Sequence, residues 1–160
     1  MTISVGDRVP STTLHHMTGE GPAEITTDAL FGGKTVALFA LPGAFTPTCS
    51  AKHLPGYVAN ADALKAKGVD TIVCLSVNDA FVMGAWGEDR GVGDTVMMAA
   101  DGSADFTRAV GLDLDLSNRG FGVRSQRYSM LVRDGEVAAL HVEAPGAFDV
   151  SDAETMLGDL

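Results

Sequence analysis

The chain has 160 residues, of which 46% are apolar, 20% charged and 6% aromatic, as is typical of a single globular domain spanning residues 1–160. Its 11 basic and 21 acidic residues give a net charge of -10, which repels a phosphate backbone and argues against nucleic acid as a partner. The amino-terminal residues have no signal-peptide pattern, and no apolar run is long enough to span a membrane. We therefore expect a cytoplasmic protein in a reducing compartment.

The first predicted elements are a buried strand followed by a long helix. Residues 36–41 form a short continuous apolar run, which is typical of a strand covered on both faces. Apolar residues at helical spacing then predict a helix over residues 49–67, with Gly68 at its end. Pro55 should kink this helix or separate its first turn.

The same alternation of strand and helix continues through the middle of the chain. Residues 71–77 and 95–100 predict two further buried strands. A helix should follow each strand, with Asn78 and Asp79 as caps of the first and Ser103 as the cap of the second.

The last third of the chain predicts a loop and then a hairpin. Residues 111–126 contain turn residues without a clear period, so we expect a loop there. Residues 128–133 and 136–142 are two apolar runs on either side of Asp134-Gly135, a pair that favours a tight turn between antiparallel strands.

A final helix is predicted by a capping box, in which Ser151 is followed three residues later by Glu154. Taken together, the order of elements indicates an α/β protein of thioredoxin-like architecture, with a central mixed β-sheet flanked by helices. Other α/β folds share most of this order.

The segment 42–50, PGAFTPTCS, carries the candidate chemistry. It leaves a buried strand and enters a helix, the position at which open α/β sheets usually bind ligands. Cys49 falls in the first helical turn, where unpaired N–H groups and the helix dipole favour a nucleophilic thiolate. Thr46 places a hydroxyl three residues earlier, within reach of the sulfur or a bound oxygen. Pro42 and Pro47 stiffen the turn.

Each of the two cysteines has to be weighed against a purely structural role. Two cysteines are too few for a disulfide framework, and without a CxxC pair or suitably spaced histidines the chain predicts no zinc site. Most lone cysteines are small buried hydrophobes, and Cys74, inside a predicted strand, fits that role. Cys49 lies in a turn among Thr, Pro and Ser, and the residues alone leave both roles open for it.

The segment 42–50 resembles the peroxiredoxin signature P-x-x-x-T-x-x-C, and its wording is similar to that of the peroxiredoxin V subfamily. Residues 50–57, 74–82, 114–117 and 122–130 resemble further segments of the same subfamily, so the resemblance covers nearly the whole chain. It implies a thioredoxin-like fold and the reduction of hydrogen peroxide and small alkyl hydroperoxides by a thiol-dependent peroxidase.

The resemblance also implies a role for each site residue. Cys49 is the peroxidatic cysteine, Thr46 holds the peroxide through its hydroxyl, Pro42 shields the sulfur and Arg127 supplies a cation. The chemistry agrees with these roles, because the thiolate attacks one peroxide oxygen and charge builds up on the other. Fixed donors stabilise that charge. The product on the enzyme is a sulfenic acid.

Several residues near the signature keep alternative roles. By its own sequence context Arg127 cannot be told from a surface arginine, and Arg124 is the next candidate, with an acidic side chain as its expected partner. His53 follows Cys49 by four residues and either lines the pocket, tunes the thiolate or is simply structural. Phe45 and Phe121 are expected in a pocket wall, in a subunit contact or in the core.

The reductive half of the cycle is expected to need an external thiol. The chain has no cysteine after Cys74, and Cys74 is predicted inside a strand, which makes a disulfide with Cys49 unfavourable. We expect a one-cysteine cycle with no bound cofactor, completed by glutathione with glutaredoxin or, as second choice, by thioredoxin. The resemblance further implies a homodimer near the active-site loops, with Phe45, Phe81 and Trp86 as candidate contacts.

Two other functions stay open. A thiol–disulfide oxidoreductase of the same fold would normally carry CxxC, whereas Thr46 occupies the position of the first cysteine. A non-enzymatic redox sensor or an oxidation-triggered chaperone would share the first chemical step with a peroxidase, but it would react once and stop.

Overall fold

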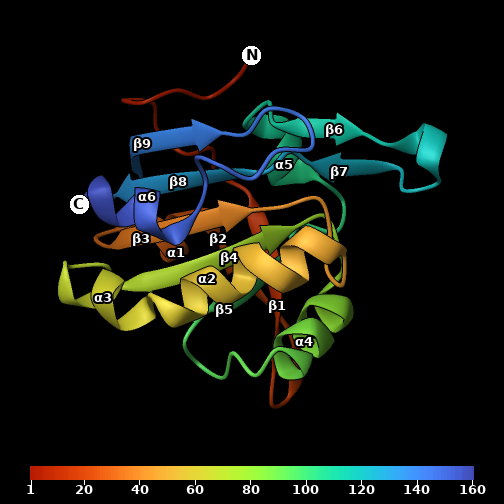
Figure 1. The fold of residues 1–160 in the computed structure, drawn as a ribbon, viewed down its shortest axis with the longest axis horizontal. Helices are drawn as coiled ribbons and strands as arrows, with labels where there is room; N and C mark the ends of the chain where they lie inside the picture. The colour runs from red at the N-terminus through yellow and green to blue at the C-terminus, as the bar shows by residue number, and fades with distance from the viewer.

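The computed structural model describes all 160 residues. Its centre is a seven-stranded sheet in the order β2-β1-β5-β4-β3-β8-β9 (Figure 1). Neighbours β3, β4 and β5 run parallel and the remaining pairs run antiparallel, so the sheet is mixed, as expected. The strands are β1 (Thr13–Thr18), β2 (Gly21–Thr26), β3 (Thr35–Ala40), β4 (Thr71–Ser76), β5 (Met97–Ala100), β8 (Tyr128–Arg133) and β9 (Glu136–Val142).

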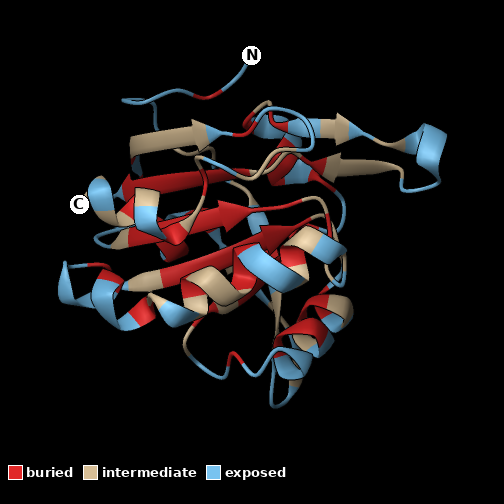
Figure 2. Ribbon diagram, in the orientation of Figure 1, coloured by how far each residue is buried: buried red, intermediate tan, exposed pale blue.

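Helices cover both faces of this sheet. Helices α2, α3, α4 and α6 contribute buried side chains to one core, and α1 and α5 contribute to the other. Because both faces are covered, β3, β4 and β8 are almost entirely buried (Figure 2), and this explains their continuous apolar sequences. The helices are α1 (Thr27–Phe31), α2 (Leu54–Ala59), α3 (Ala61–Ala66), α4 (Ala80–Asp89), α5 (Asp105–Ala109) and α6 (Ala153–Gly158).

Strand β3 divides its side chains between the two cores. Ala37 and Phe39 face the core under α2, whereas Leu38 and the other alternate residues face the core under α5. The ring of Phe39 stacks on Tyr57 of α2 with 4.0 Å between centroids. This contact fixes α2, and with it the turn before α2, against the centre of the sheet.

The region 111–126 was expected to be a loop, and that prediction was wrong. It forms a separate two-stranded sheet of β6 (Asp113–Asp115) and β7 (Val123–Ser125), which extends from the side of the main sheet (Figure 1). Each strand has only three residues, too few to show a period of two. The connection contains a short 3-10 turn, Ser117–Arg119.

The amino-terminal hairpin of β1 and β2 and the helix α1 were not predicted. β1 has one fully buried residue, Leu14, and β2 has none, so neither strand shows a clear apolar face. The Asp134-Gly135 turn was predicted correctly. Both residues have positive φ angles, 49° and 79°, as a tight two-residue hairpin turn requires.

Of the predicted N-terminal caps, only Asp79 is confirmed: its carboxylate accepts a hydrogen bond from the Val82 N–H at 2.8 Å. The predicted helix end at Gly68 is also confirmed, because Gly68 follows the C-cap residue Lys67 with a φ angle of 102°. Ser103 does not cap α5, because the buried carboxylate of Asp101 accepts from the first-turn N–H groups of Phe106 and Thr107 instead. None of the helices has both the length and the apolar character needed to cross a lipid bilayer.

The capping box expected at the last helix is absent. Helix α6 begins after Asp152, and Glu154 lies in its first turn. The hydroxyl of Ser151 donates to the carboxylate of Glu143 at 2.6 Å, and its oxygen accepts no hydrogen bond from a helix N–H. The box fails because the N-cap is Asp152, one residue later than predicted, so Ser151 lies outside the helix.

Candidate active site

The segment that follows β3 places Cys49 at the carboxyl end of the parallel strands. Leu41 extends the pairing of β3 through a hydrogen bond from its N–H to the Leu75 carbonyl. The chain then turns at Phe45, whose φ angle is 64°, and becomes helical, with the Ser50 N–H bonded to the Thr46 carbonyl at 2.9 Å. Cys49 lies in this first turn, as predicted, and is fully buried.

The helix predicted over residues 49–67 is three shorter helices. Residues Cys49–His53 form a π-helical turn, in which the Leu54 N–H bonds to the Cys49 carbonyl, and α2 and α3 follow. Pro55 accounts for the first break, because it has no N–H and its ring would collide with the carbonyl four residues earlier in an α-helix. The expectation that Pro55 separates the first turn is therefore confirmed. Such π turns are common at functional sites.

Arg127 reaches the sulfur from the start of the neighbouring strand β8. Strand β8 pairs antiparallel with β3, and this register sets Tyr128 opposite Ala40, where each strand meets the active-site segment. Arg127 precedes Tyr128, and its Nη2 donates to the Cys49 Sγ at 3.1 Å. The guanidinium is therefore in direct hydrogen-bond contact with the sulfur.

His53 is fully buried and contacts the same arginine. Its Nδ1 lies 2.8 Å from the Arg127 Nη1, and its Nε2 lies 3.0 Å from the Ser151 carbonyl oxygen. Burial, together with the nearby Arg127 charge, lowers the pKa of His53 from 6.5 to about 3. The imidazole is therefore neutral near pH 7. His53 thus contacts the site through Arg127.

Thr46 and Pro42 lie on either side of Gly43. The Thr46 hydroxyl donates to the Gly43 carbonyl at 2.7 Å, so its proton is committed and its oxygen remains able to accept a hydrogen bond. Pro42 is half-buried, and its carbonyl accepts from Arg124 Nη1 at 3.2 Å. Arg124 Nε also donates to the Phe121 carbonyl at 2.9 Å.

The acidic partner expected for Arg124 is therefore wrong. Arg124 forms no ion pair and instead binds two backbone carbonyls, which connects β7 to the active-site segment. A guanidinium fits this role because its donors can serve carbonyl oxygens on two segments at once.

Glu143 is a buried carboxylate that sequence analysis missed. Its Oε2 accepts four hydrogen bonds, from the N–H groups of Asp149, Val150 and Ser151 and from the Ser151 hydroxyl, at 2.6 to 2.9 Å. Burial raises the pKa of Glu143, but the four donors outweigh burial and hold it below its usual value. The only signal in the sequence is an acidic residue directly after an apolar strand, which usually indicates a solvated strand end.

Cys74 lies on β4, fully buried in the same core as Cys49. Burial raises the pKa of the Cys74 thiol well above its usual value, and the neighbouring Cys49 raises it further. Both cysteines are free thiols. The two sulfurs thus have different surroundings: Cys49 has a guanidinium donor, and Cys74 is enclosed in the core.

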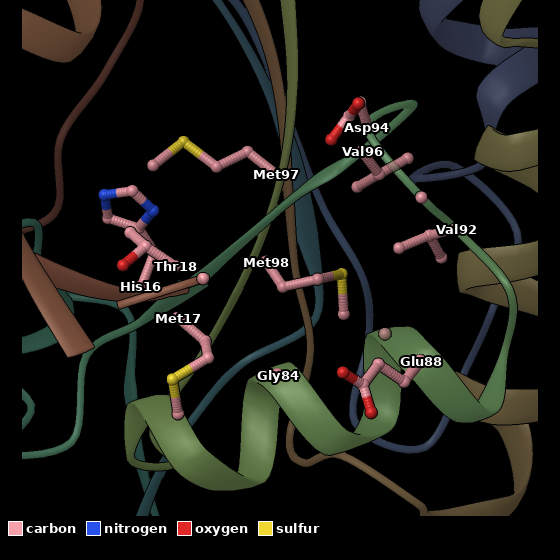
Figure 3. A pocket seen from close by; sticks show the side chains of 13 residues that line it. His16, Met17, Thr18, Gly84, Glu88, Val92, Asp94, Val96, Met97 and Met98 are labelled. Atoms are coloured by element: carbon pink, nitrogen blue, oxygen red, sulfur yellow. The ribbon is translucent and has the colours of Figure 1, made fainter. Parts of the chain in front are cut away.

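Two cavities are relevant to binding. A cavity of about 300 Å³ is lined by Pro42, Thr48 and Arg127, together with Leu114 and the turn that follows Glu143, whereas Cys49 is buried and does not line it. A larger cavity, of about 500 Å³, lies between β1, α4 and β5 (Figure 3). Strands β1 and β5 pair only at His15 and Ala100 and separate beyond that point. The larger cavity is lined by none of the predicted site residues, whereas the smaller one is lined by Pro42 and Arg127.

The aromatic residues near the site differ in exposure. Phe45, Phe81 and Phe121 are 53%, 64% and 50% exposed. Trp86 is fully buried, and its indole N–H donates to the Ser50 hydroxyl at 3.0 Å. The prediction of Trp86 as a subunit contact is therefore wrong, because helix α4 turns it into the core next to the active-site turn.

Known proteins resemble the chain over almost its whole length. The Redoxin family matches residues 4–157. Peroxiredoxin-2E, chloroplastic, of Arabidopsis thaliana is 51% identical over 98% of this chain and 68% of its own length. Reduced Prx3 of Vibrio vulnificus, solved in complex with H2O2, is 54% identical with a TM-score of 0.94 and covers 98% of both chains.

Peroxiredoxin 5 of Alvinella pompejana is 32% identical, with a TM-score of 0.88 over 98% of this chain and 97% of its own. These likenesses confirm the expected thioredoxin-like fold with its mixed sheet and flanking helices. Together with a sulfur held beside a guanidinium, they identify the chain as a member of the peroxiredoxin family, of the Prx5 type, and hence as a thiol peroxidase.

Proposed function

We propose that Cys49 is the peroxidatic cysteine, and that it reduces hydrogen peroxide and small alkyl hydroperoxides in a one-cysteine cycle. The observation that carries this proposal is the contact of 3.1 Å between the Cys49 Sγ and the Arg127 Nη2. A buried sulfur with a cation as its hydrogen-bond donor has the environment of a reactive thiolate, whereas Cys74 has the environment of an inert thiol.

In the first step the Cys49 thiolate attacks one peroxide oxygen and the O–O bond breaks. Cys49 becomes a sulfenic acid, and the other oxygen leaves as hydroxide or alkoxide and takes up a proton. Arg127 lies close enough to stabilise the charge on the leaving oxygen, and the Cys49 N–H, which has no protein acceptor, is a second donor. The Thr46 hydroxyl accepts a hydrogen bond from the peroxide, because it already donates its own proton in a hydrogen bond to the Gly43 carbonyl.

The smaller cavity supports small organic substrates as well as hydrogen peroxide. Its volume of about 300 Å³ holds an alkyl group of modest size next to Arg127. The Pro42 ring at its wall limits the access of water to the sulfur. Pro42 is therefore proposed as the residue that shields the reactive thiolate and the sulfenic acid.

An external thiol completes the proposed cycle. One thiol condenses with the Cys49 sulfenic acid to form a mixed disulfide and water, and a second thiol attacks that disulfide and releases the Cys49 thiol. Burial of Cys74 and its raised pKa disfavour it as the resolving group. Glutathione with glutaredoxin is the first candidate donor and thioredoxin the second. A reducing cytoplasm, the expected location, supplies both.

A homodimer is proposed on the surface that carries the exposed phenylalanines. Phe45 belongs to the active-site segment, Phe81 to the first turn of α4 and Phe121 to the β6–β7 connection, and each is at least half exposed. Large apolar side chains that are at least half exposed favour association when they lie together in an interface. Analytical ultracentrifugation of the wild-type chain and of Phe81→Ser tests this assembly, and a wild-type chain that sediments as a monomer would contradict it.

Peroxide consumption tests the proposed function. The wild-type chain should turn over continuously with glutathione and glutaredoxin, or with thioredoxin, and Cys49→Ser should be inactive. The matched variant Cys74→Ser should keep its turnover. A single stoichiometric reaction with every donor would instead indicate a redox sensor or chaperone, and turnover by Cys49→Ser would refute the proposed cysteine.

A further inference from the structure

Glu143 and Cys49 are connected by an unbroken series of hydrogen bonds through Ser151, His53 and Arg127. We propose that Glu143 is a positioning residue, which holds the Arg127 guanidinium on the Cys49 sulfur by fixing the Ser151 carbonyl behind His53. This inference rests on the proposed role of Cys49.

The series begins with the fixed turn after β9. All four hydrogen bonds to Glu143 reach one carboxylate oxygen and come from three consecutive residues, Asp149, Val150 and Ser151. Three N–H groups on one acceptor leave this backbone little freedom to rotate. The Ser151 carbonyl is thereby held toward the core, where it accepts hydrogen bonds from the His53 Nε2 and the Tyr57 hydroxyl, each at 3.0 Å.

The Ser151 carbonyl then selects one tautomer of His53. A carbonyl oxygen can only accept, so the Nε2 atom that faces it must carry the ring proton. A neutral imidazole has a single ring proton, and Nδ1 is left with a lone pair. That lone pair faces the Arg127 Nη1 at 2.8 Å, which makes His53 an acceptor for the guanidinium.

Arg127 transmits this orientation to the sulfur because its guanidinium is rigid and planar. When Nη1 is bound to His53, the direction of Nη2 is fixed, and Nη2 is the atom 3.1 Å from Cys49 Sγ. Glu143 also holds the main chain of Arg127, because the Glu143 N–H donates to the Arg127 carbonyl at 2.9 Å. Both ends of Arg127 therefore depend on Glu143.

The turn held by Glu143 also covers the series from outside. Phe148 lies within this turn, with its ring centroid 4.9 Å from that of His53 and 5.8 Å from the Arg127 guanidinium carbon. Glu143 forms no ion pair with Arg127, so its influence is exerted through geometry rather than through direct charge pairing.

The test compares the first chemical step in matched variants. Each reduced protein is mixed with hydrogen peroxide, and the rate of sulfenic acid formation is measured by stopped flow across pH 5 to 9. Glu143→Ala should slow this step by about 10–100-fold, because a displacement of roughly 1 Å at a reacting group has an effect of that size. Glu143→Gln keeps an acceptor oxygen and should restore most of the rate.

A control separates positioning from loss of stability. His141 on β9 contacts Asp159 after α6 at 2.8 Å, so His141→Gln loosens the same two elements without touching the series. It should react with peroxide at the wild-type rate. Equal losses in Glu143→Ala and His141→Gln would overturn the inference, because general loosening would then explain both.

A double variant provides the decisive readout. If Glu143 acts through His53, then His53→Ala should slow the first step by a similar factor, and Glu143→Ala with His53→Ala should be no slower than His53→Ala alone. Multiplied losses would overturn the inference. Should Glu143→Ala fail to fold, Ser151→Ala replaces it, because this change removes one of the four hydrogen bonds to Glu143. Ser151→Ala should slow sulfenic acid formation by a smaller factor in the wild-type background and should not slow it further in the His53→Ala background. A further loss of rate in that background would overturn the inference.

Failure of the inference and failure of the proposed function give different results. Cys49→Ser is included in every series. If it reacts with peroxide like the wild-type chain, the proposed function is wrong. If it is inactive and Glu143→Ala reacts at the wild-type rate, the function stands and only the role of Glu143 is refuted.

Discussion

The Arg124 Nη1 atom lies only 2.6 Å from the place where a Cβ atom at Gly43 would stand. A Cβ atom at this position would therefore displace the Arg124 guanidinium, and the conflict arises from the close approach of another segment rather than from the backbone angle of Gly43. The same arginine nitrogen donates a hydrogen bond to the Pro42 carbonyl, so Arg124 of β7 passes close to Gly43 and fixes the start of the active-site segment.

We predict that Gly43→Ala displaces Arg124 and slows peroxide reduction several-fold. Arg124→Ala should have a similar effect, and adding Gly43→Ala to Arg124→Ala should cost little more, because the steric conflict is then gone. Steady-state kinetics on the three variants check this. Gly56→Ala in α2 is the control, since a Cβ there meets nothing within 4 Å, and it should stabilise the helix by about 0.5–1 kcal/mol.

Arg127→Gln should slow sulfenic acid formation by about 100–1,000-fold, the usual effect of removing one donor to a developing oxyanion. Arg127→Lys keeps the charge but lacks the rigid planar fork that directs one nitrogen at His53 and another at Cys49, so it should recover only part of that rate. Stopped-flow measurements determine both values. Arg119→Gln at the exposed tip of the β6–β7 connection should react normally, and an equal loss there would indicate a general charge effect.

Cys74→Ala should leave peroxide turnover intact with any donor that serves the wild-type chain. The side chain is fully buried in β4, so the loss of its sulfur should reduce the free energy of unfolding by about 1 kcal/mol. Chemical denaturation measures the stability, and mass spectrometry of the peroxide-treated wild-type chain looks for a disulfide. A Cys49–Cys74 disulfide that accumulates during turnover would contradict the one-cysteine cycle.

The buried His53 should make the fold less stable as the pH falls. Its pKa is about 3 in the folded chain and 6.5 without burial, so between these values the unfolded chain binds a proton that the folded chain does not. The free energy of unfolding should therefore decrease from pH 6.5 downward, by at most about 1.4 kcal/mol per pH unit. Urea titrations between pH 6.5 and 5, above the range of most carboxylates, measure the slope.

His53→Gln should flatten that slope, while the control variant His15→Gln, at an exposed position of β1, should keep it. An identical slope in His53→Gln would show that other groups produce the pH dependence.

The part of the site that could be predicted from the sequence is the part contained in one short segment. Pro42, Thr46 and Cys49 lie within eight residues, and the strand before them and the helix after them place them together. Arg127 needed the family resemblance, because its contact with Cys49 depends on the pairing of β3 with β8. Glu143 was missed, since no local pattern distinguishes a buried anchor from a solvated strand end.

The fold was predictable where burial on both faces produces continuous apolar runs, as in β3, β4 and β8. It was not predictable where strands are three residues long, as in β6 and β7, or where neither strand has a clear apolar face, as in β1 and β2. The caps predicted at Ser103 and Ser151 failed for a related reason. Asp101, just before Ser103, accepts from the first-turn N–H groups of α5, and Glu143, just after β9, accepts from the Ser151 hydroxyl.

The antiparallel pairing of β3 and β8 means that Arg127 contacts the Cys49 sulfur only in a chain that has completed its sheet. Cys49 and Arg127 belong to segments 78 residues apart and meet only when these strands align. A newly synthesised or heat-unfolded chain lacks this contact. The peroxide reactivity proposed for Cys49 should therefore arise only on folding, and an unfolded chain should be oxidised at this sulfur no faster than at an ordinary thiol.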